Sequence, residues 1–327
     1  MSEKTPEYRK EVCTMFEVFQ LTLSKVGMLL IFIGIGYFLR WHHDLPDDAG
    51  RVLSLLCTLV FLPAYFITNL SKNITMEVLE EKARLVGYGA IFVVTAILLS
   101  FLLSMPFHKK NKIERNSLIY AFAIPNYGYF GYPVIEGVFG SAMLADVMVF
   151  LIPLSLTAHS VGYALFIGDK KIPLKKILLT PIFVSLVISI CLGLSGIVLP
   201  AFLDSALQGL ANCMSPCSML LAGFMLGRFP LKDLLKGWRP YVYSAIRLIG
   251  IPLIFGAILL ACNIKGQYLM MPLLVVGIPL GLNLVVYPES QGYEKQASEN
   301  AKLCFVSYLL ALIVLPFTYA LINRLVG

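Results

Sequence analysis

Residues 123–133 of this chain read AIPNYGYFGYP, and residues 277–283 read GIPLGLN. Each stretch places proline, glycine and asparagine in the middle of an apolar segment. Proline removes a backbone donor and clashes with the preceding turn, while glycine relaxes the backbone, so both stretches predict a broken helix. A break in lipid is tolerated only where protein buries it or where it lines a cavity. The two stretches therefore decide how we interpret the rest of the sequence.

The composition indicates a membrane protein. Of the 327 residues, 58% are hydrophobic and 14% are charged, and the mean hydropathy is +0.81. A soluble protein carries roughly 25% charged residues and could not hide this much apolar surface from water. The net charge of +7 comes from lysines and arginines between the apolar runs, which indicates topology signals and excludes a nucleic-acid partner.

The apolar runs predict ten membrane-spanning helices, because a helix needs about 20 mostly apolar residues to cross a bilayer. We expect an all-α polytopic fold in which the fourth and ninth helices are discontinuous. The predicted spans are residues 16–38, 52–70, 85–105, 118–139, 143–167, 178–199, 207–226, 241–262, 268–287 and 303–322.

The loops between these spans differ in positive charge. One face collects about twice as many Lys and Arg residues as the other, which places it in the cytoplasm and both termini on the outer face of the cell inner (plasma) membrane. Five spans per half invert the second half relative to the first. We therefore predict two inverted five-helix repeats at 16–168 and 178–327, an N-terminal extramembrane segment at 1–15 and a cytoplasmic linker at 169–177.

The matched breaks predict a binding site for an anion. In this topology the second half-helix of each broken span begins at the bilayer midplane. Two sets of free N–H groups and two positive dipole ends therefore meet at the same depth, and Asn126 and Asn283 can add amide donors. Interrupted spans at corresponding positions are typical of transporter substrate sites. The alternative is that these residues mark kinks or close helix packing.

The same residues resemble the auxin efflux carrier family of membrane transporters. The resemblance covers most of the chain and depends on the order and spacing of several short motifs. They are Asn126, Gly128, Gly131 and Pro133 followed by Gly137 and Gly140; Pro279 and Asn283 followed by Glu289 and Gly292; and Leu62, Pro63, Ala64, Pro216, Gly223, Arg247, Pro252, Leu315 and Pro316 in other spans.

The resemblance implies ten spans in two inverted repeats, outside termini, and broken helices that cross at spans four and nine. It also implies transport of organic anions, since the family includes plant auxin exporters and bacterial permeases for malate and malonate. The short central loop is similar to the bacterial branch. The family often has Asn where this chain has Ser155, and His159 one turn later could take over part of that contact.

The breaks and the resemblance together predict the substrate-binding residues. They are Pro125, Asn126, Tyr127, Gly128, Gly131, Ser155, His159, Pro279, Gly281 and Asn283.

Ionisable residues inside the spans are further candidates for function. His159 could carry a coupling proton, because imidazole titrates near neutral pH; a neutral, hydrogen-bonded His is the alternative. Asp146, Glu136 and Asp204 are expected in contact with water near the outer ends of spans. Arg247 could pair with the substrate, but the end of a helix is the favoured partner.

We expect a secondary active transporter that carries small organic anions, such as malate, malonate or auxin-like acids, by alternating access. A membrane-embedded sensor or receptor that uses the same cavity without transport is the alternative. An enzyme is not expected, since the sequence shows no paired carboxylates, activated nucleophile or metal-spaced His cluster. We expect no cofactor and no metal. The expected partners are the anion, the lipid bilayer and a coupling proton or sodium ion, and a homodimer is left open.

Overall fold

The fold is described from a computed structural model of the chain, which covers residues 14–107, 111–167 and 179–326. Most of the expected N-terminal segment and linker, at 1–15 and 169–177, lie outside these residues. Apart from one isolated β-bridge, every regular element of the described residues is helical, which confirms the all-α prediction. In chain order the helices are α1 (Met15–Trp41), α2 (Ala49–Leu56), η1 (Cys57–Phe61), α3 (Leu62–Leu70), η2 (Met76–Val78), α4 (Leu79–Ser104), α5 (Lys112–Ala123), η3 (Tyr127–Gly131), α6 (Tyr132–Phe150), α7 (Ile152–His159), α8 (Val161–Ile167), α10 (Pro181–Ser195), α11 (Ala201–Leu226), α12 (Leu231–Leu234), α13 (Arg239–Ala245), η4 (Ile246–Gly250), α14 (Ile251–Ala261), α15 (Gln267–Val276), α16 (Asn283–Ser290) and α17 (Glu294–Val326).

Seven apolar helical stretches among the described residues are long enough to cross a membrane. They are Met15–Trp41, Ala49–Leu70, Met76–Ser104, Tyr127–Phe150, Ala201–Leu226, Arg239–Ala261 and Glu294–Val326.

The remaining predicted spans, at 143–167, 178–199 and 268–287, are built of shorter helices. A continuous helix over 143–167 was the wrong expectation. The backbone leaves helical geometry at Leu151 and at Ser160, and Pro153 lacks the N–H that a continuous helix would need there.

Three π-helical turns each stand directly before an X-Pro pair, with prolines Pro63, Pro133 and Pro252. Proline has no N–H, and its ring clashes with the carbonyl four residues earlier, so a widened turn relieves the crowding. In each turn the residue before the proline donates its N–H to a carbonyl five residues back. These donor and acceptor pairs are Leu62 to Cys57, Tyr132 to Tyr127 and Ile251 to Ile246.

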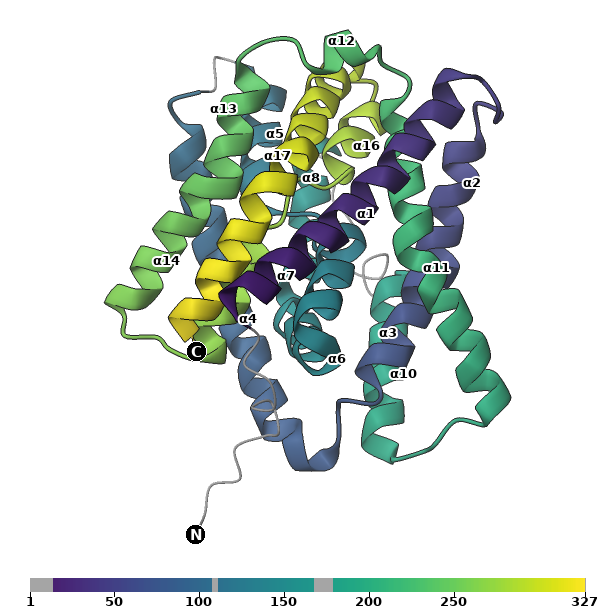
Figure 1. The fold of residues 1–327 in the computed structure, drawn as a ribbon, viewed down its shortest axis with the longest axis vertical. Coiled ribbons are helices and arrows are strands. Elements are labelled where there is room, and N and C mark those ends of the chain that lie inside the picture. The colour runs from purple at the N-terminus through teal and green to yellow at the C-terminus, as the bar shows by residue number, and fades with distance from the viewer. Residues whose placement is uncertain (1–13, 108–110, 168–178, 327) are drawn as a thin grey trace.

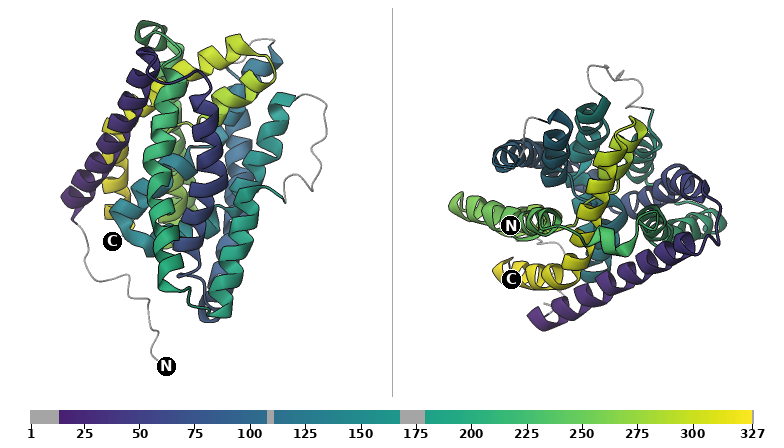
Figure 2. Two further views of the ribbon diagram at one scale, coloured as in Figure 1. Left: turned by 90° about the vertical axis from the view of Figure 1, so that its right-hand side faces the viewer. Right: turned by 90° about the horizontal axis from the view of Figure 1, so that it is seen from above.

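The helices pack as two bundles (Figure 1). The peripheral bundle consists of α1, α2, η1, α3, α10 and α11, and the crossing bundle consists of α4 to α8, η3 and α13 to α17 with η4. Helix α1 packs against both α11 and α17, so it borders both bundles. The start of α1 and the end of α17 lie near each other in every view (Figure 2).

Helices α1 and α11 approach so closely that their contact requires glycine. A Cβ atom on Gly36 would lie 2.1 Å from the carbonyl oxygen of Leu220, and one on Gly223 would lie 1.9 Å from that of Ile33. Small residues allow membrane helices to gain van der Waals contact along their backbones. These two glycines therefore hold α1 in the peripheral bundle.

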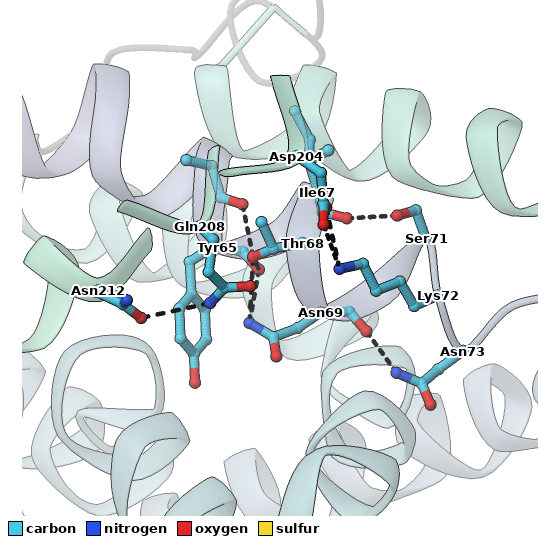
Figure 3. Close-up of polar contacts among 11 residues, drawn as sticks. Tyr65, Ile67, Thr68, Asn69, Ser71, Lys72, Asn73, Asp204, Gln208 and Asn212 are labelled. Carbon is cyan, nitrogen blue, oxygen red and sulfur yellow. Dashed lines mark hydrogen bonds and ion pairs between the residues drawn. The ribbon is translucent and has the colours of Figure 1, made fainter. Parts of the chain in front are cut away.

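Ionic contacts join neighbouring helices within each bundle. Lys72, just after α3, lies 2.9 Å from Asp204 in α11 (Figure 3). Asp204 is 38% exposed, in agreement with the expected contact with water. Asp146 is only 15% exposed and pairs with Lys82, so open hydration was the wrong expectation for this carboxylate. Glu136 accepts a hydrogen bond from a buried tyrosine of α3.

The substitution Gly36→Ala should lower the thermal stability of the purified protein in detergent. The new methyl group would meet a backbone carbonyl that cannot rotate away, and overpacking of this kind costs about 1–3 kcal/mol. Gly34→Ala is the matched control, because a Cβ two residues earlier meets nothing within 4 Å. Equal melting temperatures for the two variants would contradict the close contact between α1 and α11.

Candidate functional site

The two non-helical segments meet inside the crossing bundle. Residues 124–126 separate α5 from η3, and residues 277–282 separate α15 from α16. Pro125 and Leu280 pair as an isolated antiparallel β-bridge. Both helices are therefore interrupted where the sequence predicted, and the two interruptions lie against each other. We call these two segments the crossing.

Hydrogen bonds between its two segments and to side chains of α17 hold the crossing together. The N–H of Asn126 donates to the carbonyl of Pro279 at 2.8 Å. The side-chain amide of Asn126 donates to the hydroxyl of Tyr308 at 3.1 Å. The N–H of Leu280 donates to the hydroxyl of Ser307 at 3.3 Å. Backbone groups freed by each break thus find partners in the other break or in α17.

The second half-helix of each broken span begins at the crossing. At η3 the first helical hydrogen bond is donated by Phe130 to the carbonyl of Asn126 at 3.3 Å, and at α16 it is donated by Leu284 to the carbonyl of Gly281 at 3.1 Å. The N–H groups just before these donors have no acceptor within their own helix. Two helix N-termini, each with a partial positive charge, therefore lie next to each other.

The starts of these half-helices are also the part of the crossing that is open. Residues 121–126 are buried, whereas Tyr127, Gly128, Gly281 and Asn283 are partly accessible. A Cβ atom on Gly128 would meet nothing within 4 Å. Open space therefore lies beside Gly128 at the start of η3, and the residues at both half-helix starts are partly exposed.

Helix α7 brings Ser155 and His159 toward this space. The Ser155 hydroxyl lies beside the hydroxyl of Tyr127. Ser155 and His159 line a cavity of about 20 Å³ together with Phe183 of α10, which is room for about one water molecule. The His159 Nδ1 atom is buried and has no hydrogen-bond partner among the described residues. Within those same residues, no three His, Cys, Asp or Glu side chains are placed to share a metal ion.

His159 is the last residue of α7, one helical turn beyond Ser155. Gly131 is buried against Ile278, where a Cβ atom would lie 2.4 Å from the Ile278 Cδ1 atom. Asn283 is the first residue of α16, and its side chain lies beside the hydroxyl of Tyr120. The remaining predicted residues belong to the crossing or to the turn that follows it.

Sequence reasoning missed Ser307 and Tyr308, which bind the crossing from α17. The available signal was a polar pair inside an apolar span.

The sequence analysis did single out Arg247, and the helix end that it predicted as the partner is confirmed. The Arg247 Nη1 atom donates to the carbonyl of Phe122, near the end of α5, at 3.2 Å. The Arg247 side chain is buried, and its Nε and Nη2 atoms have no hydrogen-bond partner within the described residues.

A polar cavity of about 730 Å³ lies between α5, α13 and α17. Ser117 and Asn300 line it, and Arg239 pairs with Glu114 at its side, 3.0 Å apart. The Asn300 amide donates to the carbonyl of Leu284 at 2.6 Å. Asn300 therefore connects the wall of this cavity to the first turn of α16.

The open side of the crossing faces the peripheral bundle. The hydroxyls of Thr58 in η1 and Tyr129 in η3 lie 3.3 Å apart, so two π-helical turns meet across the boundary. A second contact across the same boundary joins α3 to α6, where the Tyr65 hydroxyl donates to the Glu136 carboxylate.

Comparisons with known proteins identify the family to which the chain belongs. A family model described as "Membrane transport protein" matches residues 22–169 and, a second time, residues 166–319. The transporter MJ1031 of Methanocaldococcus jannaschii is 25% identical over 219 residues, which cover 65% of this chain and 71% of the relative. The transporter YfdV of Escherichia coli K12 is 20% identical over 263 residues, which cover 77% and 82%. Both relatives are named as uncharacterized transporters, and the family is one of membrane transporters rather than enzymes. The chain belongs to this membrane transport protein family, the auxin efflux carriers that its sequence resembles.

Proposed function

We propose that this protein is a secondary active transporter of small organic anions and that the crossing is its substrate site. One observation carries the proposal: two half-helices begin beside each other, and residues at both starts are partly exposed. Helix N-termini bind anions through these N–H groups and through the helix dipole. A carboxylate is the anion whose size and acceptor geometry suit such a site.

The side chains around the half-helix starts support a carboxylate with a short carbon skeleton. Asn126 and Asn283 offer amide groups. Tyr127, Tyr129 and Tyr287 cluster beside them and provide aromatic faces for the apolar part of the ligand. Malate, malonate and auxin-like acids all combine these features. Pro125, Gly128, Gly131, Ser155, His159, Pro279 and Gly281 complete the proposed site.

The division into two bundles supports alternating access. The substrate site belongs to the crossing bundle, while the surface that faces it belongs to the peripheral bundle. The polar contacts described across this boundary are few, and they involve side chains such as Thr58 and Tyr129 rather than backbone ladders. We propose that one bundle moves relative to the other and exposes the crossing to each side of the membrane in turn.

The proposed architecture is ten spans in two inverted repeats, 16–168 and 178–327. Two observations support it: the family model matches the chain twice, and a broken helix occurs at a corresponding place in each half. The proposal also places both termini on the outer face of the inner (plasma) membrane and the linker at 169–177 in the cytoplasm. It further includes a homodimer and a coupling proton or sodium ion. The nearness of the α1 start to the α17 end fits termini on one face.

Purified protein in liposomes should take up radiolabelled malate, malonate or indole-3-acetate, and Asn126→Ala should abolish this uptake. The substitution removes an amide at the half-helix start and its bond to Tyr308. Uptake is measured against empty liposomes, and folded protein is quantified by size-exclusion chromatography.

Asn116→Ala is the matched control for this experiment. Asn116 is also a buried asparagine, in α5, and its amide donates to the carbonyl of Leu165 at 2.6 Å. Each variant therefore loses one buried hydrogen bond, worth about 1 kcal/mol, but only Asn126 borders the crossing. Uptake lost equally in both variants, or retained in both, would show that the crossing is not the substrate site.

If His159 carries the coupling proton, an imposed pH gradient should accelerate uptake by the wild type, and His159→Gln should remove that acceleration. Glutamine keeps polar atoms in the small cavity beside Ser155 but cannot titrate. The readout is the ratio of initial uptake rates with and without the gradient. A ratio that is unchanged in His159→Gln would rule out the coupling role, and an acceleration by a sodium gradient alone would assign the coupling to sodium.

A further inference from the structure

The crossing contains helix C-termini as well as helix N-termini. Helix α5 ends at Ala123, and α15 ends at Val276, each directly before its break. A helix C-terminus carries roughly half a negative elementary charge, the same magnitude as the positive charge at an N-terminus. With two of each at one place, the four dipole ends nearly cancel. The helix starts therefore do not by themselves select an anion.

Arg247 breaks this balance. It lies in η4, and its side chain is 1% exposed. Its Nη1 donates to the carbonyl of Phe122, the last residue but one of α5 and four residues before Asn126 in the chain. A guanidinium remains charged in proteins. A full positive charge thus covers the negative end of one of the two first half-helices.

The corresponding end of α15 is covered by a neutral group. The Tyr319 hydroxyl donates to the carbonyl of Leu274 at 3.0 Å. The two breaks thus have equivalent backbone ends but differ in the charge of the side chain that covers them. Arg247 is what gives the crossing an excess of positive charge.

No carboxylate of the described residues neutralises Arg247. Its Nε and Nη2 atoms are buried and lack hydrogen-bond partners there, and the buried or half-buried acids have other partners. Glu136 accepts from Tyr65, and Asp146 pairs with Lys82. A charge held this way in a low-dielectric interior acts over a longer range than it would in water, and none of the acidic side chains that the structure describes pairs with it.

We propose that Arg247 is the residue that makes the crossing selective for anions. It is a positioning residue that acts through its charge and through α5. Its guanidinium covers the negative end of α5 and so leaves the positive helix starts unopposed. A bound carboxylate then supplies the counter-charge of Arg247. The inference rests on the proposed function, because it concerns the ligand of the same site. A guanidinium that only caps α5 would affect stability but not the preference for charge.

The test measures how strongly the protein distinguishes a carboxylate from its neutral amide. Malonate, malate and indole-3-acetate are each titrated beside the corresponding primary amide into purified full-length protein in nanodiscs, and the ratio of the two Kd values is recorded. The wild type should bind at least one carboxylate more tightly than its amide. Arg247→Gln should weaken carboxylate binding about tenfold or more and leave amide binding unchanged. Tyr319→Phe, which removes the neutral cover at the other break, should leave the ratio unchanged.

Arg247→Lys keeps the charge but loses the guanidinium geometry, so it should retain the wild-type ratio even if its melting temperature falls. A ratio in Arg247→Gln equal to that of the wild type would overturn the inference while leaving the transporter proposal intact. If Arg247→Gln does not fold, loss of the ratio in Arg247→Lys overturns it instead. A wild type that binds none of the six compounds would contradict the proposed substrate class rather than the role of Arg247.

Discussion

A single constraint shapes the centre of this protein: backbone N–H and C=O groups exposed by a broken helix cannot be left without partners in a membrane interior. The bond from the Asn126 N–H to the Pro279 carbonyl meets this constraint for both breaks at once. This bond requires the two segments to touch. Contact between them sets where α5 and α15 end and where η3 and α16 begin. Ser307 and Tyr308 of α17 supply further partners, which ties the last span to the crossing.

The two kinds of helix end at the crossing are treated differently, and this difference suits a transporter. Donors from other helices cover carbonyls at the C-terminal ends of the first half-helices, whereas residues at the starts of the second half-helices are partly exposed. In the proposed function, the same features that stabilise the breaks also form the anion site at the boundary between the two bundles. A break that was fully satisfied on every side would be stable but could not bind a ligand.

The sequence predicted the all-α fold and both breaks, because proline and glycine act locally on the helix that contains them. It could not predict the Tyr308 and Ser307 contacts or the pairing of Asp146 with Lys82, since these join residues far apart in the chain. The interruption of span five was missed although Pro153 was visible, because its apolar run is long enough for one helix. The predicted site residues Asn126 and Gly131 lie at the crossing, but counting only helix starts overlooked the opposing helix ends and the part played by Arg247.

The most direct test of the central claim is a cryo-electron microscopy structure of the protein with a saturating carboxylate. The account predicts ligand density at the crossing, with a carboxylate oxygen within hydrogen-bonding distance of an N–H group at the start of η3 or α16. Density confined to the polar cavity that Ser117 and Asn300 line, with the crossing closed and empty, would contradict it.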